Sequence, residues 1–371
     1  MKVEIIAVGN EVIYGHTVNT NASYLAKQVQ LIGLVPSYMG AISDDPNKIK
    51  EALNVALQRS ELIIFTGGLG AALDELKKEE IFLKEATILE NDCGTVPGYL
   101  LEVQGKVVIL LPGSPREMEM MFSKYTLPLL KKRTSAIIKH LDIKCFGIDE
   151  RELAHQIDPL LGNHEGVNVS TYINEGEVLV RITVHDEMEE KAVKMIEQIK
   201  NKIEACLEPY IFGYNEDKLE ENLMQLLLER HMTVATVESC TGGLIAATLI
   251  NYSGASACFN EGIITYSNEA KMKYVDVSAE TLKSVGAVSE ETAREMAEGI
   301  RKRAHVDIGL SSTGIAGPGG GTPSKPVGLV YVGIATAQGT EVFKLQLSGS
   351  RQEVRQKTVK HILFQLYKHL K

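Results

Sequence analysis

The sequence has no excess of positive charge, no closely spaced pair of cysteines and no long apolar run. Its 39 Lys and Arg residues are outnumbered by 48 Asp and Glu residues, giving a net charge of −9. This argues against direct nucleic-acid binding, which rests on clustered cations. No apolar stretch approaches the roughly 20 residues of a membrane-spanning helix. Five scattered cysteines without a CxxC pair indicate reduced thiols in a cytoplasmic protein rather than disulfides or a zinc site.

The length of the chain predicts more than one domain, because 371 residues exceed the ~100–200 residues of an ordinary one. Strands alternate with helices in residues 1–135 and again in residues 214–371, which predicts α/β domains with parallel sheets. Residues 136–213 are expected to form a small α+β connector, with short strands near residues 139–146 and 177–184 and helices at residues 151–161 and 187–207. This segment is acidic and has no GxxG loop of the kind that clamps RNA, so we expect a structural or dimerising role within a homodimer.

A serine directly follows the apolar strand predicted at residues 232–237, in the segment ESCTGG. Thr241, Gly242 and Gly243 then open the next helix, whose N-terminal N–H groups carry partial positive charge, and we expect these three residues to help bind the substrate and its phosphate. Because these groups can stabilise an alkoxide or an oxyanion, Ser239 is a candidate nucleophile for acyl transfer. The alternative is that Ser239 caps the helix, and the turn alone favours the cap.

A tyrosine and a lysine, Tyr266 and Lys271, lie just beyond the next strand in the segment TYSNEAK. Burial lowers the pKa of a lysine, and a neutral amine can take the proton of a serine hydroxyl, so a Ser–Lys pair can replace a Ser–His pair. For an arbitrary lysine, a solvated helix position is the more common outcome. The thiol of Cys240 is intrinsically more nucleophilic than Ser239, but we expect the turn to direct it away, so it is a secondary candidate.

A glycine-rich segment, STGIAGPGGG, follows the strand predicted at residues 307–312. Five glycines in eight residues let backbone N–H groups approach a phosphate, and Thr313 can donate its hydroxyl to a reacting group. A plain flexible loop is the alternative. The glycines that we expect at the phosphate are Gly314, Gly317, Gly319 and Gly320.

Two arginines, Arg351 and Arg355, lie one turn apart at the predicted start of the last helix. The helix macrodipole disfavours cations at this position unless they serve a ligand, and a phosphate is the natural one. A pair of solvated arginines explains the spacing equally well.

Polar and glycine residues also follow the strands predicted in the first domain. The segments GNEVIYG and TGGLG are consistent with a phosphate cradle, and neighbouring carboxylates can hold a hard divalent ion such as Mg²⁺. Tight turns without a ligand are the more common explanation of a lone GGxG. The candidate cradle consists of Asn10, Glu11, Gly67, Gly68, Gly70, Asp74 and Glu117, with Glu11, Asp74 and Glu117 as metal ligands.

Together these motifs resemble the CinA family, the competence/damage-inducible protein A proteins, over nearly the whole chain. GNEVIYGHTVNTN, TGGLG, NDCGTVPGY and LLPGSPREM resemble its molybdopterin-binding-like first domain. ESCTGG, TYSNEAK, STGIAGPGGG, KPVG and GSRQEVR resemble its C-terminal amidohydrolase domain, which releases the carboxamide nitrogen of nicotinamide mononucleotide as ammonia. The segment between them resembles the KH-type connector of the family.

The resemblance implies a role for each matching residue of the third domain. Ser239 is the nucleophile and Lys271 is its base. Tyr266 and Thr313 assist the reaction. The glycine loop and Arg351 bind the phosphate of the nucleotide, and the reaction needs no cofactor.

For the first domain the resemblance implies a pyrophosphatase that acts on ADP-ribose with a divalent metal, Mg²⁺ or Co²⁺. The sequence departs from the family here, since Ala71 and Ala72 replace the usual Pro-Thr and a long helical stretch after GGLG is missing. Because the deletion removes one wall of the cleft, we expect the fold to persist and the pyrophosphatase activity to be weak or absent. A third hypothesis is a non-catalytic nucleotide-binding scaffold related to competence or DNA damage.

Overall fold

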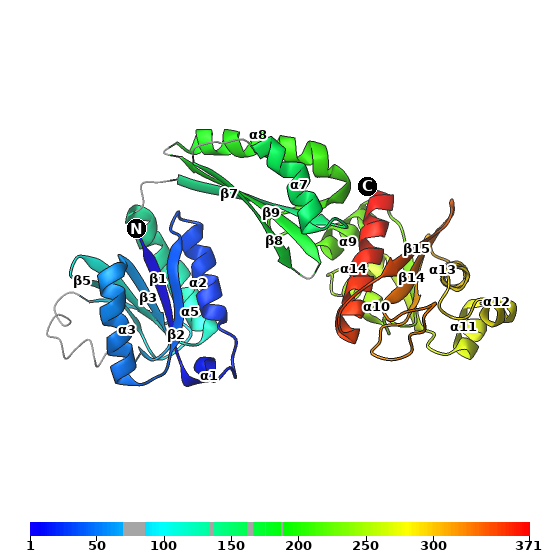
Figure 1. Ribbon diagram of the computed structural model, residues 1–371, viewed down its shortest axis with the longest axis horizontal. Coiled ribbons are helices and arrows are strands. Elements are labelled where there is room, and N and C mark those ends of the chain that lie inside the picture. Colours follow the sequence, from blue (N-terminus) through cyan, green and yellow to red (C-terminus); the bar gives the residue numbers. More distant parts are fainter. Residues whose placement is uncertain (70–85, 134–136, 162–165, 175, 187) are drawn as a thin grey trace. The chain divides into compact units, whose positions relative to one another are not determined.

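A computed structural model of the chain describes residues 1–69, 86–133, 137–161, 166–174, 176–186 and 188–371. The described residues form three sheets of six, four and five strands, which follow one another along the sequence (Figure 1). Helices are interspersed with the strands of each sheet. The predicted mixed α/β class is therefore confirmed.

The first domain contains the six-stranded sheet, in the order β2-β1-β3-β6-β5-β4. Its elements are β1 (Val3–Val8), α1 (Asn10–Ile13), α2 (Thr20–Gln30), β2 (Pro36–Ile42), α3 (Pro46–Arg59), β3 (Leu62–Thr66), β4 (Thr87–Leu89), β5 (Gly98–Val103), β6 (Lys106–Leu111), α5 (Pro115–Met121), a π-helical turn (Phe122–Thr126) and α6 (Leu127–Arg133). Every residue of β1 and β3 is buried, as expected for inner strands of a sheet covered on both faces.

The predicted parallel sheet is correct for four of these strands and wrong for two. β1, β2, β3 and β6 run parallel, whereas β5 is antiparallel to β6 and β4 is antiparallel to β5. The reason for the reversal between β5 and β6 is the two-residue connection of Gln104 and Gly105, which have φ angles of 51° and 75°. Two successive positive φ values produce a tight hairpin, which can only join antiparallel strands.

The connector contains the four-stranded sheet, in the order β10-β7-β9-β8. Its elements are β7 (Ile137–Phe146), α7 (Glu150–Leu161), β8 (Val167–Asn174), β9 (Glu177–Asp186), α8 (Glu189–Leu207), a 3₁₀ turn (Glu208–Tyr210) and β10 (Ile211–Tyr214). The sequence predicts β7, β9 and both helices but misses β8 and β10. β8 and β10 are the edge strands of this sheet; no described side chain of β8 is fully buried, and β10 has only four residues, so each gives a weak sequence signal.

The C-terminal domain contains the five-stranded sheet, in the order β12-β11-β13-β14-β15. Its elements are α9 (Leu219–Glu229), β11 (Val234–Glu238), α10 (Leu244–Ile250), a 3₁₀ turn (Ala255–Ala257), β12 (Phe259–Ile264), α11 (Asn268–Val275), α12 (Ala279–Ser284), α13 (Glu290–Ala304), β13 (Ile308–Gly314), β14 (Leu329–Thr336), β15 (Gly339–Gln346) and α14 (Arg351–Leu370). β11, β12 and β13 are parallel, and β14 and β15 are antiparallel to their neighbours.

Two groups of helices cover opposite faces of the C-terminal sheet (Figure 1). One hydrophobic cluster joins α9, α10 and α14 to β14, and another joins α11 and α13 to β11. Residues of β11 alternate between them, with Val234 in the first cluster and Val237 in the second. Because β11, β12 and β13 are parallel, the residues that follow all three strands meet at one edge of the sheet.

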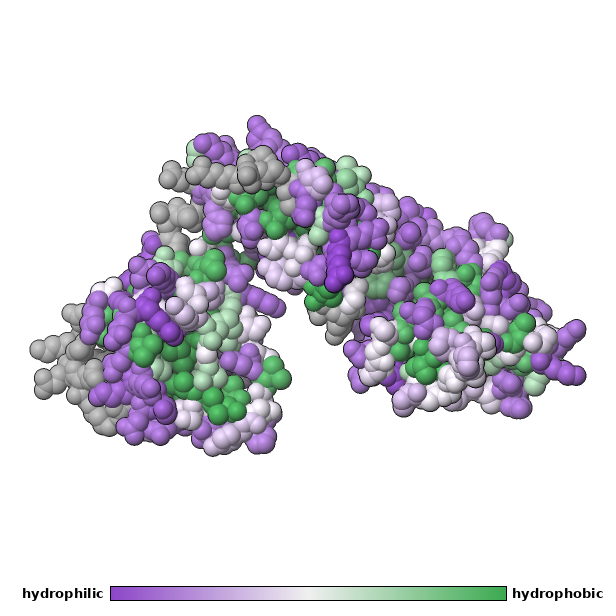
Figure 2. Space-filling model, viewed as in Figure 1, coloured by the Kyte–Doolittle hydropathy of each residue, from purple (hydrophilic) through white to green (hydrophobic). Residues whose placement is uncertain are grey.

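The surface in view intersperses hydrophilic and hydrophobic residues (Figure 2). Among the residues described, no helix combines the length and the apolar character that crossing a membrane requires.

Candidate active site

Ser239 and Lys271 lie together at the carboxyl edge of the C-terminal sheet. Ser239 directly follows β11, and Lys271 lies in the first turn of α11, which follows β12. Lys271 Nζ is 3.1 Å from Ser239 Oγ and donates a hydrogen bond to the Thr265 carbonyl at 2.8 Å. The two residues that were predicted to react as a pair are therefore within hydrogen-bonding distance.

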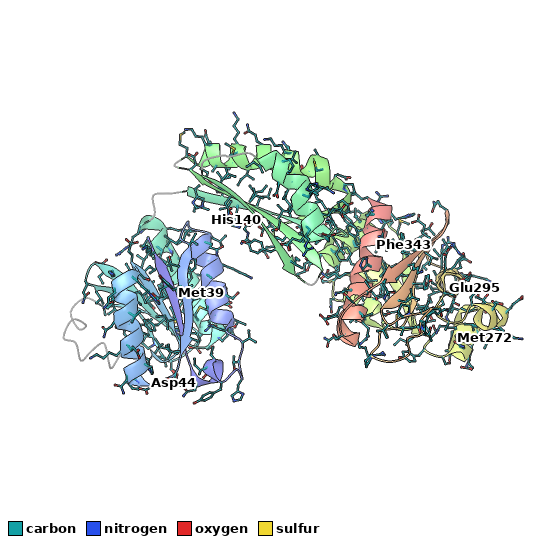
Figure 3. All side chains as sticks on the ribbon, viewed as in Figure 1. Met39, Asp44, His140, Met272, Glu295 and Phe343 are labelled. Atoms are coloured by element: carbon teal, nitrogen blue, oxygen red, sulfur yellow. The ribbon has the colours of Figure 1, made fainter. Side chains whose placement is uncertain are left out.

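The environment of Lys271 differs from that of an ordinary surface lysine. The side chain is 1% exposed, so the alternative of a solvated helix position is wrong. Burial lowers the pKa of Lys271 because it penalises the charged ammonium. Because the pKa is lowered, a larger share of Lys271 is the neutral amine, the form that can accept a proton. Figure 3 labels the neighbouring residue Met272 on α11 and Glu295 on α13, the two helices that cover this face of the sheet.

Glu238, the last residue of β11, caps α10, which is the role considered above as the alternative for Ser239. Its carboxylate accepts hydrogen bonds from the backbone N–H groups of Gly243, Ile245 and Ala246 at 2.9, 3.1 and 2.9 Å. Glu238 is 1% exposed, and a buried carboxylate at a helix N-terminus is stabilised by these donors and by the macrodipole. Ser239 is therefore not the helix cap, and its hydroxyl is directed toward Lys271 instead.

The turn that follows Ser239 is held by groups of the protein itself. Gly242 and Gly243 have φ angles of 61° and 90°, which the turn requires and which glycine adopts without strain. Thr241 is buried, its hydroxyl is 2.6 Å from Ser312 Oγ, and its carbonyl accepts two hydrogen bonds from Arg355 at 3.2 and 2.6 Å. Because the N–H of Gly243 and the hydroxyl of Thr241 have partners in the protein, these predicted phosphate donors are already engaged.

Thr313 occupies the position beside Ser239 on the neighbouring strand. Glu238 pairs with Ser312 in the register of β11 and β13, and the Ser239 N–H donates to the Ser312 carbonyl at 2.9 Å. The next residue along β13 is therefore Thr313, whose side chain is buried and whose hydroxyl donates to the Ala287 carbonyl at 2.6 Å. The hydroxyl oxygen keeps lone pairs that can still accept a hydrogen bond.

Arg351 connects two further parts of the predicted site. Its guanidinium donates to the Gly317 carbonyl at 2.8 Å and to the Tyr266 hydroxyl at 3.0 Å. Tyr266 is 64% exposed, so this rim faces solvent. Arg351 is exposed and Arg355 is half-buried, and both donate hydrogen bonds to the protein.

The glycines of the loop between β13 and β14 are placed differently from one another. Gly314 packs against Val330, since an added Cβ would lie 2.6 Å from that side chain. Gly317 is buried, whereas Gly319 and Gly320 are exposed at the tip of the loop. Gly319 and Gly320 are therefore the members of the predicted phosphate set with open space around them.

Cys240 lies in the hydrophobic cluster under α9 and α14 and is 7% exposed. Burial raises the pKa of its thiol to about 11. Since the thiolate is the reactive form of cysteine, this residue is a poor nucleophile at neutral pH. The prediction that the turn directs it away from the reacting side is consistent with this position.

The chain matches family models along most of its length. Residues 216–370 match the CinA C-terminal domain, residues 141–213 the damage-inducible protein CinA KH domain, and residues 4–132 a model described as a probable molybdopterin binding domain. A CinA-like protein of Kosmotoga olearia is 42% identical over 96% of this chain and 95% of its own. The chain belongs to the CinA family.

The chain is also similar to a further full-length protein and to a solved structure. A protein of Caldanaerobacter subterraneus subsp. tengcongensis, named for competence and damage induction, is 41% identical over 100% of this chain and 98% of its own. The solved competence damage-inducible protein A of Klebsiella pneumoniae is 35% identical, covers 42% of this chain and 98% of its own, and has a TM-score of 0.40.

The lengths of the CinA relatives agree with an internal deletion in this chain. The alignment with the Caldanaerobacter protein spans 410 positions, and this chain has 371 residues. The difference leaves at least 39 positions at which the relative has a residue and this chain has none. That these positions lie after TGGLG stays a prediction from the sequence.

The first CinA domain has a small hollow beside β1 and β3. Glu11, Asn21 and Thr66 are among its lining residues, and its volume is about 80 Å³. Asn21 donates to Thr66 Oγ1 and to the Gly113 carbonyl, both at 2.8 Å, while its buried Oδ1 has no partner among the residues described. The volume is well below the ~300–1,000 Å³ of ordinary ligand pockets.

Part of the predicted diphosphate and metal site lies around this hollow, which Glu11 lines together with Val8. Asn10 begins α1, and Gly67 and Gly68 pack against Val8, where an added Cβ would lie 2.2 Å from its atoms. Glu117 accepts a hydrogen bond from Asn91 at 2.6 Å. Gly70 and Asp74 lie outside the described residues. In the part of the chain that is described, no three His, Cys, Asp or Glu side chains group as a metal site.

Three residues that hold parts of the C-terminal domain in place have no role assigned from the sequence: Glu238, Ser312 and Lys325, whose Nζ donates to the carbonyls of Val285 and Val288. Glu238 had a visible signal, because it is a lone charge at the end of the apolar strand VATVE. Lys325 is a lone cation just beyond the glycine run. Ser312 had no such signal, since its role depends on the register between β11 and β13.

Proposed function

We propose that the C-terminal domain hydrolyses the carboxamide of nicotinamide mononucleotide to nicotinate mononucleotide and ammonia. The observation that carries the proposal is the pairing of Ser239 with a lysine that is 1% exposed and 3.1 Å away. An amine whose pKa is lowered by burial is a suitable base for a serine hydroxyl, which is a weak nucleophile without one. No metal or cofactor enters the proposed reaction.

In the first half of the reaction, the neutral amine of Lys271 takes the proton of Ser239 as Oγ attacks the amide carbon. The tetrahedral intermediate collapses when the Lys271 ammonium returns that proton to the leaving nitrogen, which departs as ammonia. The acyl group stays on Ser239. Water then attacks the ester with Lys271 again as base, and nicotinate mononucleotide is released. The Thr265 carbonyl orients the Lys271 amine throughout, at 2.8 Å.

The choice of a nucleotide substrate rests on the rim of the site and on the family resemblance. Arg351 supplies a cation beside Tyr266, and the exposed glycines of the loop leave backbone N–H groups accessible. Guanidinium and backbone N–H groups are common phosphate donors. The pyridine ring itself is proposed from the resemblance to the CinA amidohydrolase domain.

The test is ammonia release by the full chain, with and without the Ser239→Ala substitution. The wild-type chain is expected to release ammonia from nicotinamide mononucleotide, and Ser239→Ala to lower the rate at least ~10³-fold, as loss of a nucleophile does. Circular dichroism checks that the variant is folded. A folded variant with wild-type activity contradicts the mechanism, and nucleotide binding without any ammonia release by the wild type favours a non-catalytic scaffold.

A further inference from the structure

Lys325 lies in the glycine-rich connection between β13 and β14 and reaches a different part of the domain. Its Nζ donates to the carbonyls of Val285 and Val288, both at 2.6 Å. These carbonyls belong to the segment that joins α12 to α13. Ordering a lysine side chain costs up to about 2 kcal/mol of conformational entropy, so two short charge-assisted bonds indicate a defined anchoring position rather than a solvated one.

The segment that Lys325 contacts, residues 285–288, also accepts hydrogen bonds from three other side chains. Thr313 donates to the Ala287 carbonyl at 2.6 Å. Ser289 and Thr292 donate to the Gly286 carbonyl at 3.0 and 2.9 Å. Four successive carbonyls, from residue 285 to residue 288, therefore each accept a side-chain hydrogen bond.

Two basic side chains hold the glycine loop on either side of its exposed tip, in addition to the backbone hydrogen bonds between Ile315 and Gly328 and between Thr322 and Lys325. Arg351 binds the Gly317 carbonyl at 2.8 Å, and Lys325 provides the second anchor. Between these anchors lie Gly319, Gly320 and Gly321, whose N–H groups have no hydrogen-bond partner within the described part of the chain. Three adjacent glycines lose much conformational entropy when they are ordered, so an unanchored tip would bind an anion weakly.

We propose that Lys325 is a positioning residue that holds the glycine loop in the conformation that binds the substrate phosphate. The expected effect on substrate binding rests on the proposed function. The anchoring of the loop rests on the hydrogen bonds alone. Lys325 acts through the loop and has no role in the proton transfers of Ser239 and Lys271. Its loss should weaken binding of a phosphorylated substrate and leave an unphosphorylated one unaffected.

The test compares Lys325→Met with the wild type and with Lys302→Met, an exposed lysine of α13, using the full chain. Ammonia release is measured with nicotinamide mononucleotide and with nicotinamide riboside, which lacks the phosphate. For Lys325→Met we expect KM for the mononucleotide to rise at least tenfold, kcat to change less than about twofold, and kcat/KM for the riboside to stay constant. An equal loss with both substrates, or none with either, overturns the proposal.

Amide hydrogen exchange without substrate separates this proposal from the proposed function. Exchange in residues 316–325 and 285–289 should be faster in Lys325→Met than in the wild type and in Lys302→Met. Unchanged exchange overturns the anchoring role whatever the substrate. Faster exchange in a chain whose wild type releases no ammonia supports the anchor and contradicts the proposed reaction instead.

Discussion

Replacing Glu238 by glutamine should destabilise the C-terminal domain and impair catalysis together. The carboxylate accepts three backbone hydrogen bonds, at 2.9, 3.1 and 2.9 Å, in a site that is 1% exposed. A hydrogen bond to a charged group contributes about 1.5–3 kcal/mol. Glutamine keeps one acceptor oxygen, loses the charge and turns an NH₂ group toward an N–H donor. We therefore expect a loss of roughly 3 kcal/mol in the free energy of unfolding.

The expected shift in Tm follows from the size of the domain. The CinA C-terminal match spans residues 216–370, and for ~150–250 residues each kcal/mol lowers Tm by about 2–4 °C. Calorimetry should therefore place the transition of this domain roughly 6–12 °C below that of the wild type. The matched control is Glu280→Gln, an exposed glutamate in the first turn of α12, which should shift Tm by less than ~2 °C.

The catalytic consequence follows from the position of Glu238 next to the nucleophile. Release of the α10 N-terminus frees the turn that begins at Ser239, and displacement of a reacting group by about 1 Å can cost ~100-fold in rate. We expect kcat for ammonia release to fall by about tenfold to 100-fold, measured at a temperature below the Tm of the variant. A Glu238→Gln variant with wild-type Tm and wild-type kcat refutes this account of the turn.

Two further predictions concern the residues around Ser239. The ammonia-release rate should rise as pH increases through the pKa of Lys271, which burial places below the ordinary 10.5, because only the neutral amine accepts a proton. The free energy of unfolding should also rise with pH between the lowered pKa of Lys271 and 10.5, because the folded state loses the proton at lower pH than the unfolded state, and Lys271→Met should remove this contribution. A kcat profile without an ascending limb below pH 10.5 contradicts the role of the lysine. Cys240→Ala should keep kcat within about twofold, because the thiol is buried with a pKa raised to about 11; a loss of activity comparable to that of Ser239→Ala would make the cysteine the nucleophile.

The meeting of Ser239 and Lys271 was predictable from the sequence for a topological reason. Each follows an apolar strand, and the carboxyl ends of parallel strands share one edge of a sheet. Thr313 follows the same rule, because β13 is the parallel neighbour of β11. The rule brings such residues to the same edge, but it leaves open which face of the sheet each side chain takes.

The parts that the sequence analysis missed depend on contacts between segments far apart in the chain. Ser312 meets Thr241 only because of the strand register, and Lys325 meets Val285 and Val288 only once the loop has folded back. The antiparallel pairing of β5 with β6 depends on the backbone conformation of one short turn. Composition and periodicity describe single segments, so they carry little information of this kind.

The position of Glu238 also changes where a substrate anion can bind. A helix that begins beside a nucleophile is the usual place to seek a phosphate, and the sequence analysis sought it there in Thr241, Gly242 and Gly243. In the structure a resident carboxylate occupies the α10 N-terminus. A second anion at that end would meet a buried negative charge instead of free N–H groups. We therefore place the proposed phosphate site at the rim formed by Arg351 and the glycine loop. A substrate bound there by its phosphate has to reach Ser239 with its amide.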